Sequence, residues 1–240
     1  MSKDATARVA NSIAEIGASN WDVCAGSDNP FVSFAFLSSL EDSGSVCAET
    51  GWAPYHIVVE EGGATIGCAP MYLKSHSQGE FVFDQNWAHA LEQAGGQYYP
   101  KLQVSVPFSP VTGPRLLSHS ARGRDAVLSG CVQVANKLGV SSLHVTFPTF
   151  NEWKAMGDAG LLLRKDQQFI WHNDGYDCFD DFLEALSSRK RKNIRKERRE
   201  ALATDIEIEI VTGTDLKEHH WDAFYAFYRD TSDRKWGRPY

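Results

Sequence analysis

The segment from residue 101 to residue 147 constrains the fold most, because its apolar pattern changes period twice. In residues 101–106 apolar and polar side chains alternate, which is typical of a strand. Residues 127–138 instead repeat with helical spacing and end at Gly139, and alternation returns in 143–147. Two strands joined through a helix form a parallel, right-handed crossover. The segment therefore predicts a sheet covered by helices.

The remaining segments add helices and antiparallel strands to this core. We expect helices at residues 6–19, 31–43, 83–93, 151–158 and 215–231, and one that starts at 178 and runs into a basic stretch. We expect a hairpin of residues 55–60 and 64–75, a strand pair within 161–173 and a strand at 206–211. This order predicts the α/β (α+β) class, with a mixed, partly antiparallel sheet flanked by helices.

Cysteines and apolar runs limit the compartment. The chain has 240 residues, and no apolar run approaches the roughly 18 residues that span a bilayer. Its N-terminal residues have no apolar core behind a basic start, so they do not resemble a signal peptide. The five cysteines form no C-x-x-C pair and read as reduced. We therefore expect a cytoplasmic protein.

The charge of the chain is concentrated in one place. The net charge is −7, yet residues 189–199 hold eight of the 24 basic residues and one acid. This stretch carries +7, and the other residues, with 16 bases and 30 acids, carry −14. On a helix, one side would hold Arg191, Arg195 and Arg198, and a neighbouring side would hold Arg189, Lys192, Lys196 and Arg199. We interpret the stretch as a site for phosphate or a polyanion, and the alternative is a solvated helix face.

Most catalytic motifs are absent. The sequence has no G-x-G-x-x-G, P-loop, G-x-S-x-G or H-E-x-x-H pattern, and His219 and His220 are adjacent, so we expect no metal site. His172 and Tyr176 lie in a polar-aromatic segment before the basic stretch and are our candidate catalytic residues. The alternative for His172 is a structural histidine. Glu80, Asp84 and Trp87 form a similar group, for which we expect a capping or core role.

The loop at residues 107–115 replaces a motif that the element order leads us to expect. That order resembles the GNAT acyltransferase fold, whose central strand is followed by a Q/R-x-x-G-x-G/A loop that binds the pyrophosphate of coenzyme A. Here three prolines remove amide donors, and the nearest match, residues 93–98, precedes the strand. Thr112, Gly113 and Arg115 remain candidates for binding an anion. A rigid surface turn is an equally good interpretation.

Several strings together resemble the FemAB-like N-acyltransferases, a family linked to peptidoglycan biosynthesis or recognition. They are NPFVSFAFLSSLEDSG, GWAPYHI, YLKSHSQGEFVFDQNWA, YYPKLQVSVPFSPVTGPRLL, SSRKRKNIRKERR and FYRDTSDRKWGRPY. The resemblance implies a first GNAT-like domain at residues 1–176 and the start of a second at 177–240. Family members continue beyond this point, so we expect the second domain to be incomplete.

The resemblance also implies a reaction. It is the transfer of an acyl or aminoacyl group to an amine, with aminoacyl-tRNA or acyl-CoA as donor and no permanently bound cofactor. A nucleotide-sugar precursor of peptidoglycan is the implied anionic acceptor. We expect Lys101 and Arg115 to anchor anionic substrate together with Thr112, Gly113 and the basic stretch. The alternatives are an acetyl-CoA-dependent GNAT enzyme with a divergent loop, and a non-catalytic RNA-binding or membrane-surface module. The oligomeric state stays open.

Overall fold

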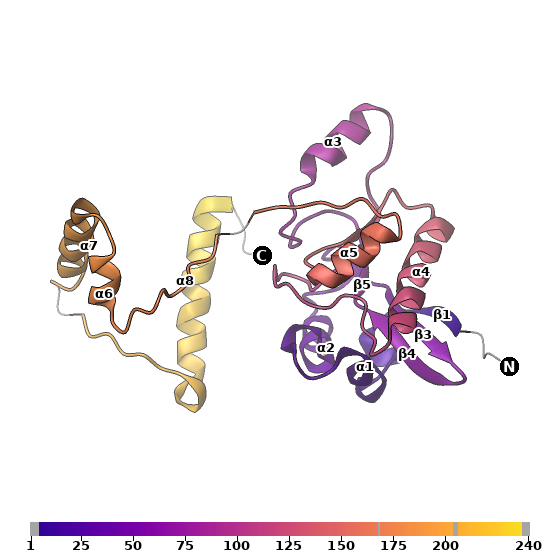
Figure 1. Cartoon of the computed structure of the whole chain (residues 1–240), viewed down its shortest axis with the longest axis horizontal. Helices are drawn as coiled ribbons and strands as arrows, with labels where there is room; N and C mark the ends of the chain where they lie inside the picture. Colours follow the sequence, from indigo (N-terminus) through magenta and orange to yellow (C-terminus); the bar gives the residue numbers. More distant parts are fainter. Residues whose placement is uncertain (1–4, 168, 204–205, 237–240) are drawn as a thin grey trace. The chain divides into compact units, whose positions relative to one another are not determined.

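The computed structural model describes residues 5–167, 169–203 and 206–236 (Figure 1). The chain divides into two compact units, Met1–Leu163 and Arg164–Tyr240. In the part of the chain that is described, no helix has the length and apolar character needed to cross a membrane.

The first unit contains two sheets. Strands β1 (Ala5–Ala10), β3 (His56–Glu61) and β4 (Ala64–Ala69) form an antiparallel sheet in the order β1-β3-β4. Strands β2 (Trp52–Pro54), β5 (Met71–Lys74), β6 (Lys101–Val104) and β7 (Leu143–Val145) form the second, in the order β2-β5-β6-β7. Strands β6 and β7 are parallel, and the other neighbours in this sheet are antiparallel.

The predicted crossover is confirmed. Helix α4 (Ala121–Leu138) joins β6 to the parallel strand β7. The Ser120 side chain caps its N-terminus by accepting a hydrogen bond from the Gly123 N–H. Gly139 ends the helix in the left-handed conformation, with φ of 63°. The loop between Val104 and Ala121 therefore lies at the carboxyl ends of two parallel strands, where α/β sheets commonly bind ligands.

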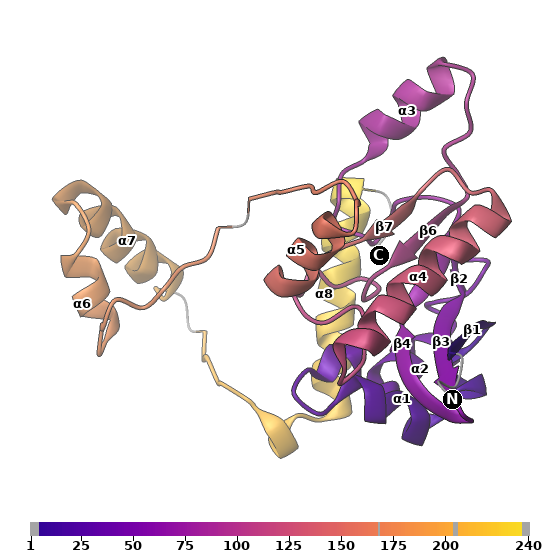
Figure 2. The same ribbon diagram turned by 45° about the vertical axis from the view of Figure 1, so that its right-hand side comes forward.

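Helices cover both faces of the β1-β3-β4 sheet (Figure 2). Val58 of β3 packs in a cluster with residues of α1 (Ala18–Ala25) and α2 (Phe34–Asp42). Its neighbours Ile57 and Val59 point the other way, into a cluster with α4 and with Leu102 of β6. This alternation gives the first unit two apolar layers, one on each side of the sheet.

Two further helices complete the first unit. Helix α5 (Phe150–Asp158) follows β7 and begins with a capping box between Thr149 and Glu152. Helix α3 (Gln85–Gln93) projects from the sheets in both views (Figures 1 and 2). The 3-10 helices are η1 (Ile13–Glu15) and η2 (Pro30–Val32), and the Asn29 side chain caps η2 by accepting a hydrogen bond from the Phe31 N–H.

The second unit is helical. It contains α6 (Phe179–Glu184), α7 (Ser188–Ala201), the 3-10 helix η3 (Gly213–Asp215) and α8 (Glu218–Trp236). Helices α6 and α7 replace the single helix that we predicted from residue 178, because the helix breaks at residues 185–187. Three short stretches of the unit lie outside the described residues, at 168, 204–205 and 237–240.

The predicted hairpin strand at 64–75 divides into β4 and β5, which lie in different sheets, and three further predicted elements were wrong. Residues 6–19 form β1, η1 and the start of α1 in place of one helix. The predicted strand pair at 161–173, of which residue 168 lies outside the described residues, and the predicted strand at 206–211 are not strands in the described part. Their apolar side chains, among them Ile170 and Ile208, are exposed. Alternation alone does not make a strand when no partner strand pairs with it.

The mixed α/β class is confirmed, with partly antiparallel sheets flanked by helices.

Candidate functional site

One face of β6 is polar although it is buried. Lys101 and Gln103 are fully buried, and Ser105, which follows the strand on the same face, is 2% exposed. The opposite face carries Leu102 and Val104, which pack in the apolar cluster against α4. Lys and Gln are seldom fully buried unless they are paired. This polar face therefore requires internal partners.

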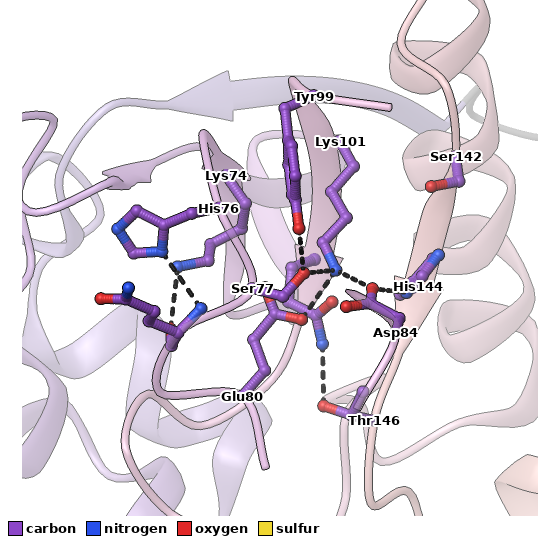
Figure 3. Close-up of polar contacts among 12 residues, drawn as sticks. Lys74, His76, Ser77, Glu80, Asp84, Tyr99, Lys101, Ser142, His144 and Thr146 are labelled. Carbon is purple, nitrogen blue, oxygen red and sulfur yellow. Dashed lines mark hydrogen bonds and ion pairs between the residues drawn. The ribbon is translucent and has the colours of Figure 1, made fainter. Parts of the chain in front are cut away.

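The partners of Lys101 come from the segment between β5 and α3 (Figure 3). Its Nζ donates to Ser77 Oγ at 2.8 Å, to Glu80 Oε2 at 2.8 Å and to Asp84 Oδ2 at 2.5 Å. The two carboxylates are as deeply buried as the lysine. Below, the Lys101 cluster means Lys74, Ser77, Glu80, Asp84, Tyr98, Tyr99 and Lys101.

Two tyrosines extend this network. The Tyr98 hydroxyl donates to Asp84 Oδ2 at 2.7 Å, and the Tyr99 hydroxyl lies 2.7 Å from Ser77 Oγ. Beside the cluster, Gln103 Nε2 donates to Thr146 Oγ1 at 2.8 Å (Figure 3). The network thus links the start of β6 with residues 75–84, below called the covering segment, and Gln103 links β6 with the end of β7. Such buried hydrogen bonds hold the Lys101, Asp84 and Ser77 side chains in one arrangement.

Burial and hydrogen bonding push the pKa values in this cluster apart. Burial raises the pKa of Glu80, against the opposing attraction of Lys101. Burial acts the same way on Asp84, but hydrogen bonds from Lys101, Ser77 and Tyr98 outweigh it and lower its pKa. Two neighbouring carboxyl groups with divergent pKa values are typical of acid–base sites.

Lys74 is the second buried cation of the cluster. Its Nζ lies 3.4 Å from the centroid of the Trp52 ring and 3.4 Å from the Gln78 carbonyl oxygen. Burial lowers its pKa to about 7, although Glu80 acts in the opposite direction. Lys74 is therefore an amine that gains or loses its proton near neutral pH.

Several buried acceptors at this face have no hydrogen-bond partner among the described residues. They are Glu80 Oε1, Asp84 Oδ1, Gln103 Oε1 and Ser105 Oγ. Buried polar atoms nearly always have partners, so such a group points to water or to a polar ligand. Two of these groups belong to Gln103 and Ser105 on the polar face of β6, and two belong to Glu80 and Asp84 in the segment that packs against it. Together they indicate a site that receives hydrogen-bond donors.

The backbone around this face is strained. Phe81, Phe108 and Phe147 have positive φ angles of 55°, 57° and 51°. Phe81 belongs to the covering segment, and the other two follow β6 and β7. The Phe108 N–H donates to the Gly79 carbonyl at 3.1 Å, which ties the loop after β6 to the covering segment. A left-handed conformation is costly for a bulky residue, and such strain concentrates at functional sites.

The structure places the predicted anchors Lys101 and Arg115 inside the first unit. Arg115 is fully buried, and its guanidinium donates to the carbonyls of Thr146 at 2.9 Å, Val111 at 2.6 Å and Pro114 at 3.1 Å. Burial lowers its pKa to about 10. The cation thus stabilises the loop at 107–115. Arg115 and Lys101 are both buried, and their role as anchors of anionic substrate stays a prediction.

The other two loop candidates differ from each other. Gly113 is buried, and its N–H donates to the Phe147 carbonyl at 3.1 Å, whereas Thr112 is exposed. The Gly113 amide is therefore already used in extending the pairing beside β7. Anion binding by Thr112 stays a prediction.

The candidate catalytic residues His172 and Tyr176 lie in the second unit, whereas the Lys101 cluster lies in the first. His172 is exposed. Tyr176 packs near Trp171 and Phe182, with ring centroids 6.3 Å and 5.8 Å away. The catalytic roles of His172 and Tyr176 stay predictions.

The basic stretch forms α7, and its two predicted sides behave differently. Arg191 pairs with Glu184, Arg195 lies 3.4 Å from Glu184 and 3.5 Å from Asp180, and the Arg198 guanidinium lies 4.2 Å from the centroid of Phe179. This side therefore packs on α6. The other side, below called the outward row, is exposed and consists of Arg189, Lys192, Lys196 and Arg199. Within the described residues, the ion pair of this row is that of Lys196 with Glu200, at 3.6 Å.

We expected a capping or core role for Glu80 and Asp84, and the structure has Asp84 as the N-cap residue of α3 and both side chains buried. Their ion pairs with Lys101 were not predicted from the sequence. The signal was Lys101 in a strand expected to lie inside the sheet, because a buried lysine needs buried acids. No group of three or more His, Cys, Asp or Glu side chains among the described residues is arranged to hold a metal ion.

Comparison with known proteins gives a family. The family model described as FemAB-like, peptidoglycan biosynthesis/recognition, matches residues 12–240. No curated protein matches the chain. Among solved structures, a Trypanosoma brucei acetyltransferase is similar at 13% identity and a TM-score of 0.41, covering 70% of this chain and 100% of its own. The aminoglycoside N-acetyltransferase AAC(6')-Iy in complex with CoA has 9% identity and a TM-score of 0.41, covering 73% and 98%.

The family match rests on the sequence. Because the family model matches most of its length, the chain belongs to the FemAB-like family.

Proposed function

We propose that this protein is an N-acyltransferase that transfers an acyl or aminoacyl group to an amine on a peptidoglycan precursor. The family description supports the link to peptidoglycan. The likeness of the sequence strings to Fem-type enzymes supports the reaction class. The polar face of β6 is the proposed reaction site, and a nucleotide-linked precursor places the reaction in the cytoplasm.

One atom carries this proposal. Glu80 Oε2 accepts a hydrogen bond from Lys101, while Glu80 Oε1 is buried and has no partner among the described residues. Burial raises the pKa of this carboxyl group, which makes it a better proton acceptor than an exposed glutamate. Lys101 fixes the orientation of the group. Glu80 is therefore the proposed general base.

The reaction balances with these groups. The nitrogen of a neutral acceptor amine attacks the carbonyl carbon of the acyl ester or thioester, and a carbon–nitrogen bond forms. The proton that the nitrogen then carries moves to Glu80 Oε1. The bond from the acyl carbon to the leaving oxygen or sulfur breaks, and the leaving group takes up the proton that Glu80 releases, directly or through water, which restores the Glu80 carboxylate. Backbone N–H groups near the end of β6 are the proposed donors to the oxyanion.

The proposed donor is aminoacyl-tRNA. The outward row of α7 offers four exposed basic side chains to a phosphate backbone. In the loop at 107–115, by contrast, the guanidinium of Arg115 is already bound to carbonyl oxygens. These two observations favour a polyanionic donor over a coenzyme A thioester held by that loop.

The domain division is also part of the proposal. We assign residues 1–176 to a first acyltransferase-like domain and 177–240 to the start of a second. The division into compact units falls at 163/164, earlier in the chain than the proposed boundary. The segment between the two positions contains Trp171 and His172.

Transfer assays test the proposal. The protein is incubated with tRNA charged with a radiolabelled amino acid and with a nucleotide-linked peptidoglycan precursor. The proposal predicts label on the precursor and none on a precursor whose amino group is acetylated. Titration calorimetry with acetyl-CoA is the second arm. Micromolar binding of acetyl-CoA together with no transfer from tRNA would contradict the proposed donor.

A further inference from the structure

The second unit has two neighbouring surface hollows beside α6. The first has a volume of about 540 Å³ and is lined by Trp171, Asn173, Tyr176, Asp177, Cys178, Phe179 and Phe182. The second, of about 410 Å³, is lined by Cys178, Phe179, Asp180, Leu183, Arg195 and Arg198. Cys178 and Phe179 line both. An aromatic hollow therefore adjoins a hollow with two arginines.

The first hollow offers ring faces. Trp171 is 65% exposed, and its ring is within 21° of parallel to that of Tyr176. Phe182 packs edge-on against both rings, with centroids 6.0 Å and 5.8 Å away. Exposed aromatic faces held by edge contacts are platforms on which unpaired bases stack.

The second hollow offers positive charge. Arg198 lies over the Phe179 ring, which positions its guanidinium at the border between the hollows. Arg195 contacts Asp180 and Glu184 at 3.5 Å and 3.4 Å, and all three side chains are at least half exposed. Exposed ion pairs are weak, so phosphate oxygens compete with these carboxylates for Arg195. Asp177 lines the first hollow, and Asp181 accepts hydrogen bonds from the Asp177 and Cys178 N–H groups at 3.0 Å and 3.1 Å.

We propose that these hollows form a nucleotide site, in which an unpaired base stacks on Trp171 and Tyr176 and the adjoining phosphate binds Arg195 and Arg198. Stacking surface next to a phosphate-binding fork is the chemistry of a single-stranded nucleotide. The site rests on the proposed function in one respect, which is that the nucleotide is the donor's. Both an RNA end and coenzyme A carry such a nucleotide.

The site is tested by measuring RNA binding, with no acyl transfer required. Calorimetry at low salt measures the affinity of the 240-residue chain for single-stranded oligoadenylate RNA and for an abasic strand of equal length. Trp171→Ala should weaken binding of oligoadenylate about fivefold or more and leave the abasic strand unaffected, because the stacking of one base is removed. Arg198→Gln should weaken binding of both strands. Trp171→Phe retains a ring face and should restore most of the affinity.

Matched controls in α8 are Trp221→Ala and Arg229→Gln, which lie outside both hollows. Far-ultraviolet circular dichroism confirms that each variant is folded. If Trp171→Ala weakens both strands equally, or no more than Trp221→Ala does, the nucleotide site is wrong. Displacement of oligoadenylate by coenzyme A would support the site and contradict the tRNA donor. If the site binds oligoadenylate and coenzyme A does not displace it, the nucleotide belongs to RNA. Neither result depends on transfer activity.

Discussion

The Nζ of Lys101 lies 2.8 Å from Glu80 Oε2, and both side chains are completely buried. Taking two charges out of water is costly, and their attraction offsets this cost only with good geometry and further hydrogen bonds. Ser77 and Asp84 supply such bonds to Lys101. The other oxygen of Glu80 receives none among the described residues. The pair therefore combines a fixed carboxylate with an acceptor atom left for another donor.

Replacing Lys101 should destabilise the first unit. Lys101→Met leaves Glu80 and Asp84 buried without their closest cation, and breaking a buried pair in this way costs about 3–5 kcal/mol. Urea unfolding near neutral pH measures the loss. Lys137→Met, at an exposed position of α4, is the control and should change stability little. A loss for Lys101→Met no greater than that of the control would show that the cluster is not a coupled network.

Lys74 should make stability depend on pH. Its pKa is lowered to about 7 in the folded protein and is about 10.4 in an unfolded chain, so between these values the unfolded state binds more protons. Stability therefore rises with pH across this window. The wild type should gain more stability than Lys74→Met between about pH 7 and pH 10, measured by urea midpoints. Equal gains in the two proteins would refute the lowered pKa.

Gly79 should tolerate no side chain. Its φ is +78°, and an added Cβ would lie 2.7 Å from the Phe108 ring. Gly95 is a matched control, because its φ is +83° and nothing lies within 4 Å of an added Cβ. Both alanine variants bear the cost of the left-handed conformation, and Gly79→Ala should lose a further 1–3 kcal/mol, roughly, from overpacking. Equal thermal midpoints for the two variants would contradict this prediction, because they would show that the covering segment shifts to make room for the added methyl group.

The outward row of α7 should control the salt dependence of RNA binding. The affinity for RNA falls as the salt concentration rises. The double variant Arg189→Gln with Lys192→Gln should make the slope of log binding constant against log salt concentration less steep, by about 0.7 for each phosphate of the single strand that the protein no longer neutralises. Arg122→Gln with Lys137→Gln removes the same charge from exposed positions of the first unit and should leave the slope unchanged. Equal changes in both double variants would show that only net charge matters.

Local patterns predicted the crossover from β6 through α4 to β7, because each of its elements carries its own period and cap. The strand β1 was missed because Ala-rich residues 5–10 favour a helix locally, whereas pairing with β3 and the 2.9 Å contact of Arg8 with Glu60 make them a strand. Tertiary pairing overrode propensity there.

The site was harder to predict than the fold. Glu80 and Lys101 are 21 residues apart, and they meet because β5 and β6 are antiparallel neighbours whose connection folds back over the polar face. The spacing of Glu80 and Lys101 in the sequence does not predict that this connection folds back over β6. Likewise, helical spacing gave two basic sides of α7, but the acids of α6 decided which side stays outward. Longer-range contacts supplied what periodicity could not.

The most direct test of the account is the transfer activity of Glu80→Gln. The substitution keeps the size of the side chain and removes its capacity to accept a proton, so transfer of label from aminoacyl-tRNA to the precursor should fall about 10²–10⁴-fold. Glu92→Gln, at an exposed position of α3, is the control and should retain full activity. Loss of any general base should lower the rate by more than about twofold. If the folded Glu80→Gln variant transfers label within about twofold of the wild type, Glu80 is not the base and the reaction site is not the polar face of β6.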